Sequence, residues 1–551
     1  MPLEYLRDGD LFFVGLNSRD NPSALSKGYV SKAQNFRMDR GVASVRKGTR
    51  KYSDISIVDK QINGCGVYLD QFGQEIMILV LYTPATTGEE PTPAYSEIVT
   101  FNPDANDWGG SVQFPTGETV DTSVGCDVVQ ANNYIFISRG HNKPVIRWEY
   151  GTINFLVLSH TNNHEFPHCS GLMYYQNRLV ALGRHKSMSA SRARDSVCVS
   201  NFLDFNKFDL VDTFTINQGG NDEIVSVVPW TMNEFLIMMR NSIFYLNVGS
   251  DRYSTGDPLS SDAFLQTMST DVGCSAKRSA VQVAGGVVFL SDTGVYFLQP
   301  QQVGAAEGMR LTTLSEPLSA TIDDVIARIN KNHVSKSVAI YWNSRYYLAV
   351  PLDGSTKNNA VLVYNFILKA WESVDIYPEE FDAFVFLVAK KGTQRRMFAV
   401  DSSDGVFLME ENNWDEHGND VGNPYLTVRL PFRFGGSDVF RQRVIQGEIV
   451  TRRFTFDSMS NKRFSSVEAD LLCPAAAAIE TYAEMNNPDT TSLLDNYGSP
   501  SDEAQDTTRR NPVRKIGYGL QVRFKSTSNR PSVRGVLVVA KPHGKNNLNV
   551  K

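Results

Sequence analysis

Short runs of apolar residues, separated by turn residues, recur along most of this chain. A glycine or asparagine is followed by an extended apolar run, as at Tyr134–Ile137 and Val287–Leu290. Such runs, bounded by Gly and Asn, are typical of β-strands joined by tight turns. The turns recur about every 53 residues, and they are centred near Gly73, Asn133, Asn177, Asn233, Gly285, Asn343 and Gly392.

A repeat of this length, with several strands in each unit, predicts the blades of a β-propeller. We therefore expect an all-β propeller over residues 61–416, with about seven blades and six to eight possible. The unit lengths scatter and no fixed dipeptide recurs, so an irregular series of hairpins in a sandwich stays open as the alternative. A short helix is expected at residues 320–332, where Thr321–Asp324 has the pattern of a capping box.

The repeat ends near residue 416, and residues 417–551 are predicted to form a separate, sandwich-like β-domain. Pro474–Glu480 is predicted to be a short helix, because proline is favoured in the first turn. Residues 486–508, rich in Asn, Asp, Ser and Thr, are predicted to be a long exposed loop. The strands expected in this domain are Tyr425–Arg433, Phe440–Phe456, Ser466–Leu472, Tyr518–Lys525 and Val533–Ala540.

Residues 1–60 are predicted to be an extended segment that contains one hairpin, at residues 28–48. Asp39-Arg40-Gly41 separates two extended runs, and Gly41 can supply the positive φ that a tight return requires. This can be an ordinary surface hairpin, or it can pack on the last blade, join the C-terminal domain or reach a neighbouring subunit. One face is expected to be buried and the other to expose Arg37, Arg40, Arg46 and Lys47.

Composition places the chain among globular proteins, with 551 residues, 42% hydrophobic and 21% charged. The longest apolar run, Ile76–Tyr82, is far shorter than the ~20 residues that span a bilayer. Acidic residues follow Met1 where a signal peptide would need an apolar stretch. The six widely spaced cysteines contain no Cys-x-x-Cys pair, which favours buried thiols in a reducing cytoplasm.

The charge is unevenly distributed. The formal net charge is −6, yet residues 507–551 contain eleven Lys or Arg and no Asp or Glu. A basic end on an acidic chain favours a contact with an acidic partner surface or with nucleic acid. A solvated basic face explains the same pattern and stays open as the alternative.

Candidate chemistry is sparse. His160, His164, His168 and Cys169 are close in sequence, and zinc takes four such ligands. However, Pro167 breaks any helix that would align them, and the spacing fits no zinc template. The chain lacks a phosphate-binding Gly-rich loop, a Gly-x-Ser-x-Gly elbow and a His-Glu-x-x-His motif. We therefore expect no catalytic residue, no metal and no cofactor, and we do not expect an enzyme.

The order of residues near the N-terminus resembles the opening of a known family. Gly15–Leu25 is followed by Gly28, Ala33-x-Asn35, Gly41 and Arg46-x-Gly48. This string resembles the start of the tail nozzle proteins of short-tailed bacteriophages (podoviruses). That family is also called tail tubular protein B and is loosely related to the packaged-DNA stabilisation proteins. The ending, from Gly517 to Lys541, is similar to C-terminal domains of phage tail components.

The resemblance implies a virion structural protein that forms a hexameric ring beneath the portal and adaptor, through which double-stranded DNA leaves the particle. Its implied partners are the adaptor and portal, tail fibres or other tail proteins, and the host envelope at the tail tip. Its implied location is the virion tail, assembled in the bacterial cytoplasm. The motif residues would be structural or interface residues, namely Asn35, Arg37, Gly41, Arg46 and Gly48.

For a DNA conduit the lumen should be neutral or negative, because each phosphate neutralised by Lys or Arg strengthens binding. The basic residues Arg523, Arg530 and Arg534 are therefore expected to face a neighbouring subunit or the adaptor. Two other functions stay open. A carbohydrate-binding or glycan-cleaving propeller for host-surface recognition would have charged and aromatic residues clustered in a pocket on its axis. A monomeric repeat scaffold would bind peptides on a rim.

Overall fold

The computed structural model describes residues 5–543, with gaps. The gaps are residues 53–56, 58–59, 87–91, 159–165, 218–219, 231–233, 249–263, 304–305, 316–324, 379–380, 403–404, 420–439 and 487–488. The expected strand Tyr425–Arg433, the turn residue Asn233 and His160 and His164 lie outside the described residues. Within the described part, no helix is long and apolar enough to span a membrane.

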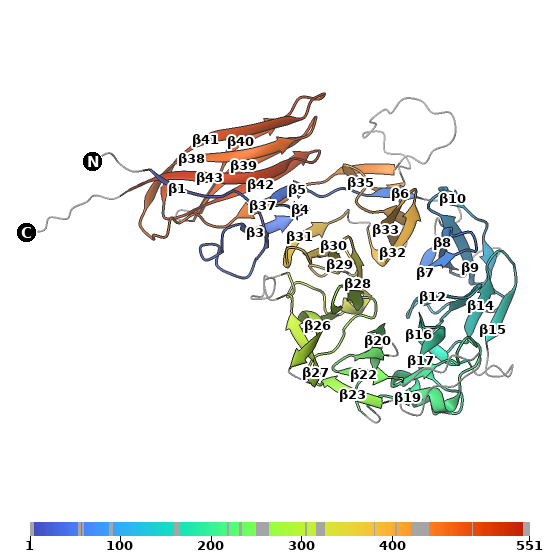
Figure 1. The fold of residues 1–551 in the computed structure, drawn as a ribbon. Coiled ribbons are helices and arrows are strands. Elements are labelled where there is room, and N and C mark those ends of the chain that lie inside the picture. The colour runs from blue at the N-terminus through green and yellow to red at the C-terminus, as the bar shows by residue number, and fades with distance from the viewer. Residues whose placement is uncertain are drawn as a thin grey trace, which may run out of the picture.

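The prediction of an all-β propeller followed by a sandwich-like β-domain is confirmed (Figure 1). In the first half of the propeller, neighbouring strands pair antiparallel within each blade. The first blade is β7 (Gln61–Leu69), β8 (Glu75–Thr83) and β9 (Tyr95–Asn102), with β10 (Asp107–Trp108) and β11 (Val112–Gln113) on β9. The second is β12 (Cys126–Ala131), β13 (Tyr134–Ile137), β14 (Val145–Glu149) and β15 (Phe155–Leu158). The third is β16 (His168–Tyr175), β17 (Arg178–Arg184), β18 (Ser196–Val199) and β19 (Thr213–Thr215).

The second half continues this arrangement around the ring. The fourth blade is β20 (Ile224–Pro229), β21 (Glu234–Met239), β22 (Ile243–Asn247) and β23 (Phe264–Ser269). The fifth is β24 (Val281–Val283), β25 (Gly286–Ser291), β26 (Gly294–Val303) and β27 (Ala306–Thr313). The sixth is β28 (Val338–Trp342), β29 (Arg345–Val350), β30 (Ala360–Asn365) and β31 (Ala370–Ile376). The last is β32 (Ala383–Lys391), β33 (Gln394–Asp401), β34 (Gly405–Leu408) and β6 (Arg50–Tyr52).

The described turns that define the sequence repeat join the first and second strands of their blades. Gly73, Gly285 and Gly392 have φ of +78°, +88° and +62°. Asn177 and Asn343 have φ of +62° and +50°, a conformation that asparagine tolerates better than most residues. The local turn chemistry therefore positioned these hairpins correctly. The expected helix at 320–332 is wrong in its described part, because residues 325–328 form turns and the short 3-10 helix η6 (Val334–Lys336) follows.

The propeller closes with a strand from the start of the chain. β6 pairs antiparallel with β34, with Lys51 opposite Phe407. The last blade thus combines three strands from its own region with one from the N-terminal segment. The pairing with β6 removes the free edge that β34 would otherwise present, and it joins two distant parts of the chain.

The rest of the N-terminal segment belongs with the C-terminal domain. β1 (Leu6–Asp10) pairs with β43 (Ser532–Pro542) of that domain. The same sheet contains β38 (Lys462–Cys473) and β41 (Gln505–Gly517). It is extended by β4 (Phe36–Asp39) and β5 (Val42–Val45) of the N-terminal segment. β2 (Gly15–Leu16) and β3 (Tyr29–Gln34) connect β31 of the propeller to the second sheet, formed by β37 (Glu448–Thr451), β42 (Leu520–Ser528), β39 (Ala478–Asn486) and β40 (Asp489–Gly498). A separate pair, β35 (Trp414–Asn419) and β36 (Phe440–Val444), lies beside β6 (Figure 1).

Two expectations for this domain are corrected. Pro474–Glu480 is a turn that leads into strand β39 instead of a helix, and Ala476 has a φ of +57°. Residues 486–508 are mostly the strands β40 and β41 instead of a loop. Exposed and partly buried residues alternate along β41 from Gln505 to Arg510. These two polar strands are the edges of two different sheets, and their composition is typical of loops. β41 pairs with β38 and β40 with β39, a pairing that was not visible locally.

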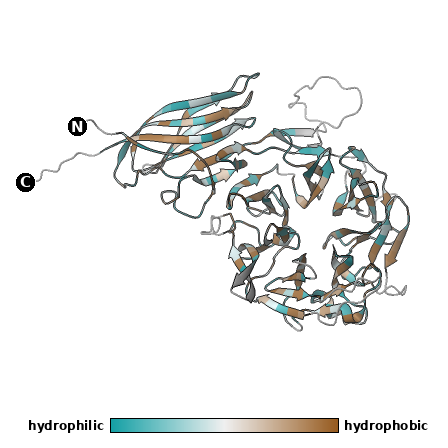
Figure 2. Cartoon of the chain, in the orientation of Figure 1, coloured by the Kyte–Doolittle hydropathy of each residue, from teal (hydrophilic) through white to brown (hydrophobic). Residues whose placement is uncertain are grey.

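One hydrophobic core runs from the propeller into the C-terminal domain. It includes Leu348 and Trp371 of the sixth blade, Phe36 of the hairpin, and Phe464 and Phe524 of the sandwich. Figure 2 shows hydrophobic residues concentrated along the strands of both parts. All six cysteines are buried and free, so the prediction of buried thiols is confirmed.

Removing residues 1–52 is expected to disrupt both parts of the molecule, because it takes away β6, the hairpin and β1 together. We expect a lower Tm and rapid proteolysis at the exposed edges of β34 and β43. Circular dichroism melting and limited proteolysis measure this, with a chain shortened by residues 544–551 as the truncation control. Unchanged melting of the N-terminal truncation would contradict the role of this segment.

Candidate functional site

The motif residues near the N-terminus meet the last two blades in a buried polar cluster. We call Asn35, Arg37 and Arg46, with Asp375, Glu410 and Asp415, the latch. Asn35 has a φ of +57° and lies between β3 and β4, where the chain passes from one sheet to the other. Its side chain donates to the carbonyl of Gln446 at 2.8 Å and accepts from the amide of Ile376 at 3.0 Å. This conformation suits asparagine among the non-glycine residues.

Arg46 is fully buried and every arm of its guanidinium is bound. Nη1 and Nη2 donate to the two carboxylate oxygens of Asp415 at 2.9 and 2.6 Å, and Nε donates to Asn35 Oδ1 at 3.0 Å. The guanidinium also lies 4.1 Å from the ring centre of Tyr377. Burial alone lowers the pKa of Arg46, but the attraction of Asp415 outweighs it and the pKa lies above its ordinary value. Arg46 therefore stays charged in the core.

Arg37 makes the second buried contact of the latch. It donates to Asp375 at 3.0 and 2.6 Å and to Glu410 at 3.0 Å. The expectation that Arg37 and Arg46 lie on an exposed face is therefore wrong, because carboxylates from the sixth blade and from the region after the last blade bury them. Arg40 and Lys47 are exposed, as expected.

Gly41 is explained by its backbone conformation, and Gly48 by the lack of space for a side chain. Arg40 and Gly41 have φ of +49° and +82° and form the two-residue turn between β4 and β5, which confirms the predicted hairpin. At Gly48 an added Cβ would lie 1.9 Å from the carbonyl oxygen of Trp414. Gly48 therefore lets the N-terminal segment pass directly beside β35.

The three C-terminal arginines do not form one cluster, and each contacts the same chain. Arg523 pairs with Glu448 at 3.3 Å and with Glu484, and Arg534 pairs with Asp470 at 2.6 Å and with Asp506. Arg530 Nε donates to the carbonyls of Val45 and Arg46 at 3.0 and 3.1 Å. Much of the basic excess at the end of the sequence is thus neutralised within the sandwich by acids that lie on neighbouring strands.

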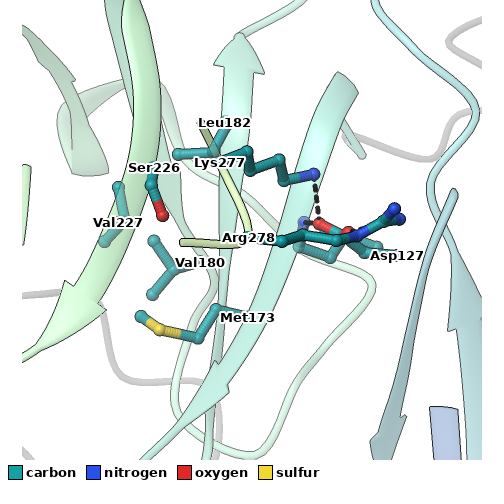
Figure 3. A pocket seen from close by; sticks show the side chains of 9 residues that line it. Asp127, Met173, Val180, Leu182, Ser226, Val227, Lys277 and Arg278 are labelled. Carbon is teal, nitrogen blue, oxygen red and sulfur yellow. Dashed lines mark hydrogen bonds and ion pairs between the residues drawn. The ribbon is translucent and has the colours of Figure 1, made fainter. Parts of the chain in front are cut away.

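A cavity of about 220 Å³ lies among the inner strands of the propeller (Figure 3). Lys277 binds Asp127 at 2.5 Å and the carbonyl of Ser170 at 2.7 Å. Arg278 donates to the carbonyls of Cys126 on β12 and Phe384 on β32, at 3.0 and 3.4 Å. Burial alone raises the pKa of Asp127, but Lys277 and Arg278 outweigh it and lower the pKa. These side chains bridge blades across the centre of the propeller.

The chemistry of this central cavity is limited. Its other walls are mainly apolar, including Met173, Val180 and Val227, and Asp127 is the carboxylate that lines it. Glycoside hydrolysis generally uses two carboxylates, one on each side of the bond. Among the described residues, no group of three or more His, Cys, Asp or Glu side chains is placed to hold a metal ion.

A larger cleft, of about 660 Å³, lies between the β4–β5 hairpin and the last two blades. Its wall contains two carboxylates, Asp39 and Glu410, and two aromatic rings, Trp342 and Tyr347. Six cations also line it, namely Arg37, Lys47, Arg345, Arg395, Arg396 and Arg530. We call this the cationic cleft. Arg37 and Arg530 were predicted to be structural or interface residues, but the blade residues were not predicted, since only the fold brings them together.

Replacing Arg46 by methionine is expected to destabilise the protein by about 3 to 5 kcal/mol, because Asp415 would be left buried without its partner. Urea unfolding measures this loss. Lys47→Met, at the exposed neighbouring position, serves as the control and should change stability by less than about 0.5 kcal/mol. Equal stability of the two variants would contradict the role given to the latch.

Gly48→Ala is expected to lower stability by about 1 to 3 kcal/mol, because the new methyl group overlaps the backbone at Trp414. Gly110→Ala is the matched control, since an added Cβ there meets no atom within 4 Å. Thermal melting of both variants tests the prediction. A Gly48→Ala protein that melts with the control would show that β35 can move aside freely.

Comparison with known proteins supplies no family assignment. No family model and no curated protein matches this chain. Solved structures that it is similar to include the WD40 domain of coronin from Toxoplasma gondii, with TM-score 0.35 and 10% identity, covering 68% of this chain and 87% of that one. Another is the extracellular domain of a protein described as a one-component system, from B. thetaiotaomicron, with TM-score 0.39 and 8% identity, covering 90% and 63%.

A third similar structure is an exo-β-1,3-galactanase from Phanerochaete chrysosporium, with TM-score 0.26 and 9% identity, covering 90% of this chain and all of that one. The expectation that the chain is not an enzyme is withdrawn, because the absent sequence motifs on which it rested belong to other folds and one of the similar structures is that of an enzyme.

Proposed function

We propose that this chain is a structural protein of the tail of a short-tailed bacteriophage, the nozzle or a related tail-tube component. It would assemble as a hexameric ring below the portal and adaptor, in a virion tail built in the bacterial cytoplasm. The observation behind the proposal is that the motif residues Asn35, Arg37 and Arg46 form the latch. Three of the residues on which the resemblance rests thus hold the N-terminal segment against the propeller and the strand pair that follows it.

One rim of the propeller has a surface suited to assembly. Because the strands within a blade are antiparallel, the described turns that join first to second strands and third to fourth strands lie on the same rim, which we call the hairpin rim. Four large apolar side chains on it, Phe72, Ile153, Val211 and Ile367, are 76 to 82% exposed. Exposed apolar side chains that gather on one face are typical of contact surfaces. A ring needs heterologous contacts, and the hairpin rim and the C-terminal sandwich are two dissimilar surfaces that could provide them.

The DNA path in this proposal lies between subunits. Arg278 crosses the centre of each propeller and binds strands β12 and β32. A duplex would therefore pass along the axis of the ring, outside every propeller. Because Arg523 and Arg534 already pair with acids of their own domain, they would not attract DNA strongly, and their proposed contact with a neighbour or the adaptor would be weak.

A second candidate function is carbohydrate recognition at the host surface. The cationic cleft favours it, because this cleft combines guanidinium groups with the half-buried ring of Trp342 and the amides of Asn343 and Gln394. Aromatic faces and planar polar groups suit sugar rings and hydroxyls. The cationic cleft is not the pocket on the propeller axis that was expected for this function. The smaller cavity among the inner strands has one carboxylate among its described lining residues, Asp127, and it is bound to Lys277.

Electron microscopy of the purified chain, with and without a portal–adaptor preparation, tests the leading proposal. We expect a hexameric ring with a central channel, alone or on that template. The channel should lie between propellers, since Arg278 bridges each propeller centre. A monodisperse monomer that ignores the template would contradict the proposal and favour the carbohydrate candidate.

Replacing Phe72 and Ile153 together by serine is expected to prevent ring assembly and leave the Tm unchanged, because both side chains are exposed. Met459→Ser is the control, since Met459 is 92% exposed on the C-terminal domain. Analytical ultracentrifugation and particle images of the three proteins measure the difference. Normal rings from the double variant would show that subunits meet elsewhere.

Charge reversal of Arg523 and Arg534 is expected to lower the Tm, because each would then face two carboxylates of its own domain. The loss should shrink in high salt, which screens repulsion between partly exposed charges. Thermal melts at low and high salt measure the effect. An unchanged Tm with impaired ring assembly would instead support a direct contact of these arginines with a partner.

A further inference from the structure

We propose that the cationic cleft binds a carboxylated saccharide, with the acid group held by Arg530. This proposal rests on the second candidate function and names its ligand class. It assigns a non-covalent binding site at the junction of the hairpin, the propeller and the C-terminal domain.

Most cations of the cleft already have acidic partners. Arg345 binds Glu372 at 2.8 and 3.0 Å, and Arg396 binds Glu411 at 2.6 Å. Arg395 binds Glu75 at 3.1 Å. These pairs leave their guanidinium groups fixed in place and largely neutralised. They form the wall of the cleft and do not supply its free charge.

Arg530 differs from the other arginines of the cleft. Its Nε is bound to the carbonyls of Val45 and Arg46, which fixes the direction of the side chain. Within the described residues it forms no ion pair or hydrogen bond with a carboxylate. It is half-buried, and burial lowers its pKa although the nearby Glu410 acts in the opposite direction. Guanidinium groups withdrawn from water are normally paired, because leaving them unpaired is unfavourable. The two Nη groups of Arg530 are thus available for both oxygens of a carboxylate, a geometry that arginine favours.

The remaining wall distinguishes a sugar from a peptide. Trp342 is half-buried, and its Nε1 is bound to the carbonyl of Arg395 at 3.3 Å, which holds the ring in place. Asn343 and Gln394 add amide groups at the mouth of the cleft, and Lys47 adds an exposed cation. Among the described lining residues none is a leucine, isoleucine or valine, which peptide anchors usually require. Hydroxyls can bind the amides while a sugar ring packs on Trp342.

The backbone around the cleft is unusual at three positions. Asn343, Ser344 and Glu410 have φ of +50°, +60° and +55°. Positive φ is unfavourable for residues such as serine and glutamate, and such residues concentrate at binding sites. Here the conformation of Glu410 accompanies its contact with Arg37 in the latch, and the turn at Asn343 and Ser344 presents the amide at the cleft.

Calorimetric titration with α-1,4-trigalacturonate tests the proposal, and the fully methyl-esterified trisaccharide is the uncharged ligand control. We expect the acid to bind and the ester to bind far more weakly. Arg530→Gln should reduce affinity for the acid by about ten- to a hundredfold, because a charge-assisted pair is lost. Arg240→Gln is the matched control, since Arg240 is a half-exposed arginine on the fourth blade.

Lys47→Gln provides a second test in case Arg530→Gln lowers the Tm, because Lys47 is exposed and lies outside the latch. It should weaken binding by about threefold, and less in high salt. Equal binding of acid and ester, no binding of the acid, or unchanged binding by Arg530→Gln would overturn the proposal. Tighter binding of hexaglutamate than of trigalacturonate would also overturn it, in favour of an acidic peptide. A neutral glycan that binds normally to Arg530→Gln would overturn the cleft assignment but leave the carbohydrate candidate standing.

Discussion

The ion pair between Arg46 and Asp415 is the interaction on which the rest of the structure depends. It connects the N-terminal segment to the region that follows the last blade, and both charges are withdrawn from water. A buried pair of this kind adds little net stability compared with an apolar contact of the same shape, but losing one partner is costly. Its main effect is therefore to specify position. The observed placement of the hairpin satisfies Arg46, Arg37 and Asn35 together, and it brings β6 to the open edge of the last blade.

The features that were predictable from sequence are those set by local chemistry. Gly73, Asn177 and Gly392 form turns because of their own conformational preferences, and these turns revealed the propeller. Features set by distant partners were not predictable. Nothing near Lys51 indicates that β6 completes a blade beside Phe407, and nothing near Pro474 indicates that the next residues pair with β42. In these cases tertiary pairing overrides local propensity.

The same distinction explains the errors about charge. A run rich in Lys and Arg suggests a basic surface only if its acidic partners are absent, and in a sheet those partners are on other strands. Arg534 finds Asp470 on β38, and Arg37 finds Asp375 on β31. The candidate site was therefore only partly predictable. Arg37 and Arg530 were identified as important, but Trp342 and Gln394 could join them only after the hairpin had been positioned.

Architecture and binding are coupled at this junction. Lys47 and Arg530 come from the two ends of the chain, whereas Trp342, Asn343 and Gln394 come from the propeller. The latch therefore both holds the C-terminal domain and creates the cationic cleft. A ligand that contacts both sides of the cleft binds only the docked arrangement and stabilises it by mass action. Such a ligand would strengthen the junction between propeller and sandwich, because it would hold both sides of the cleft together.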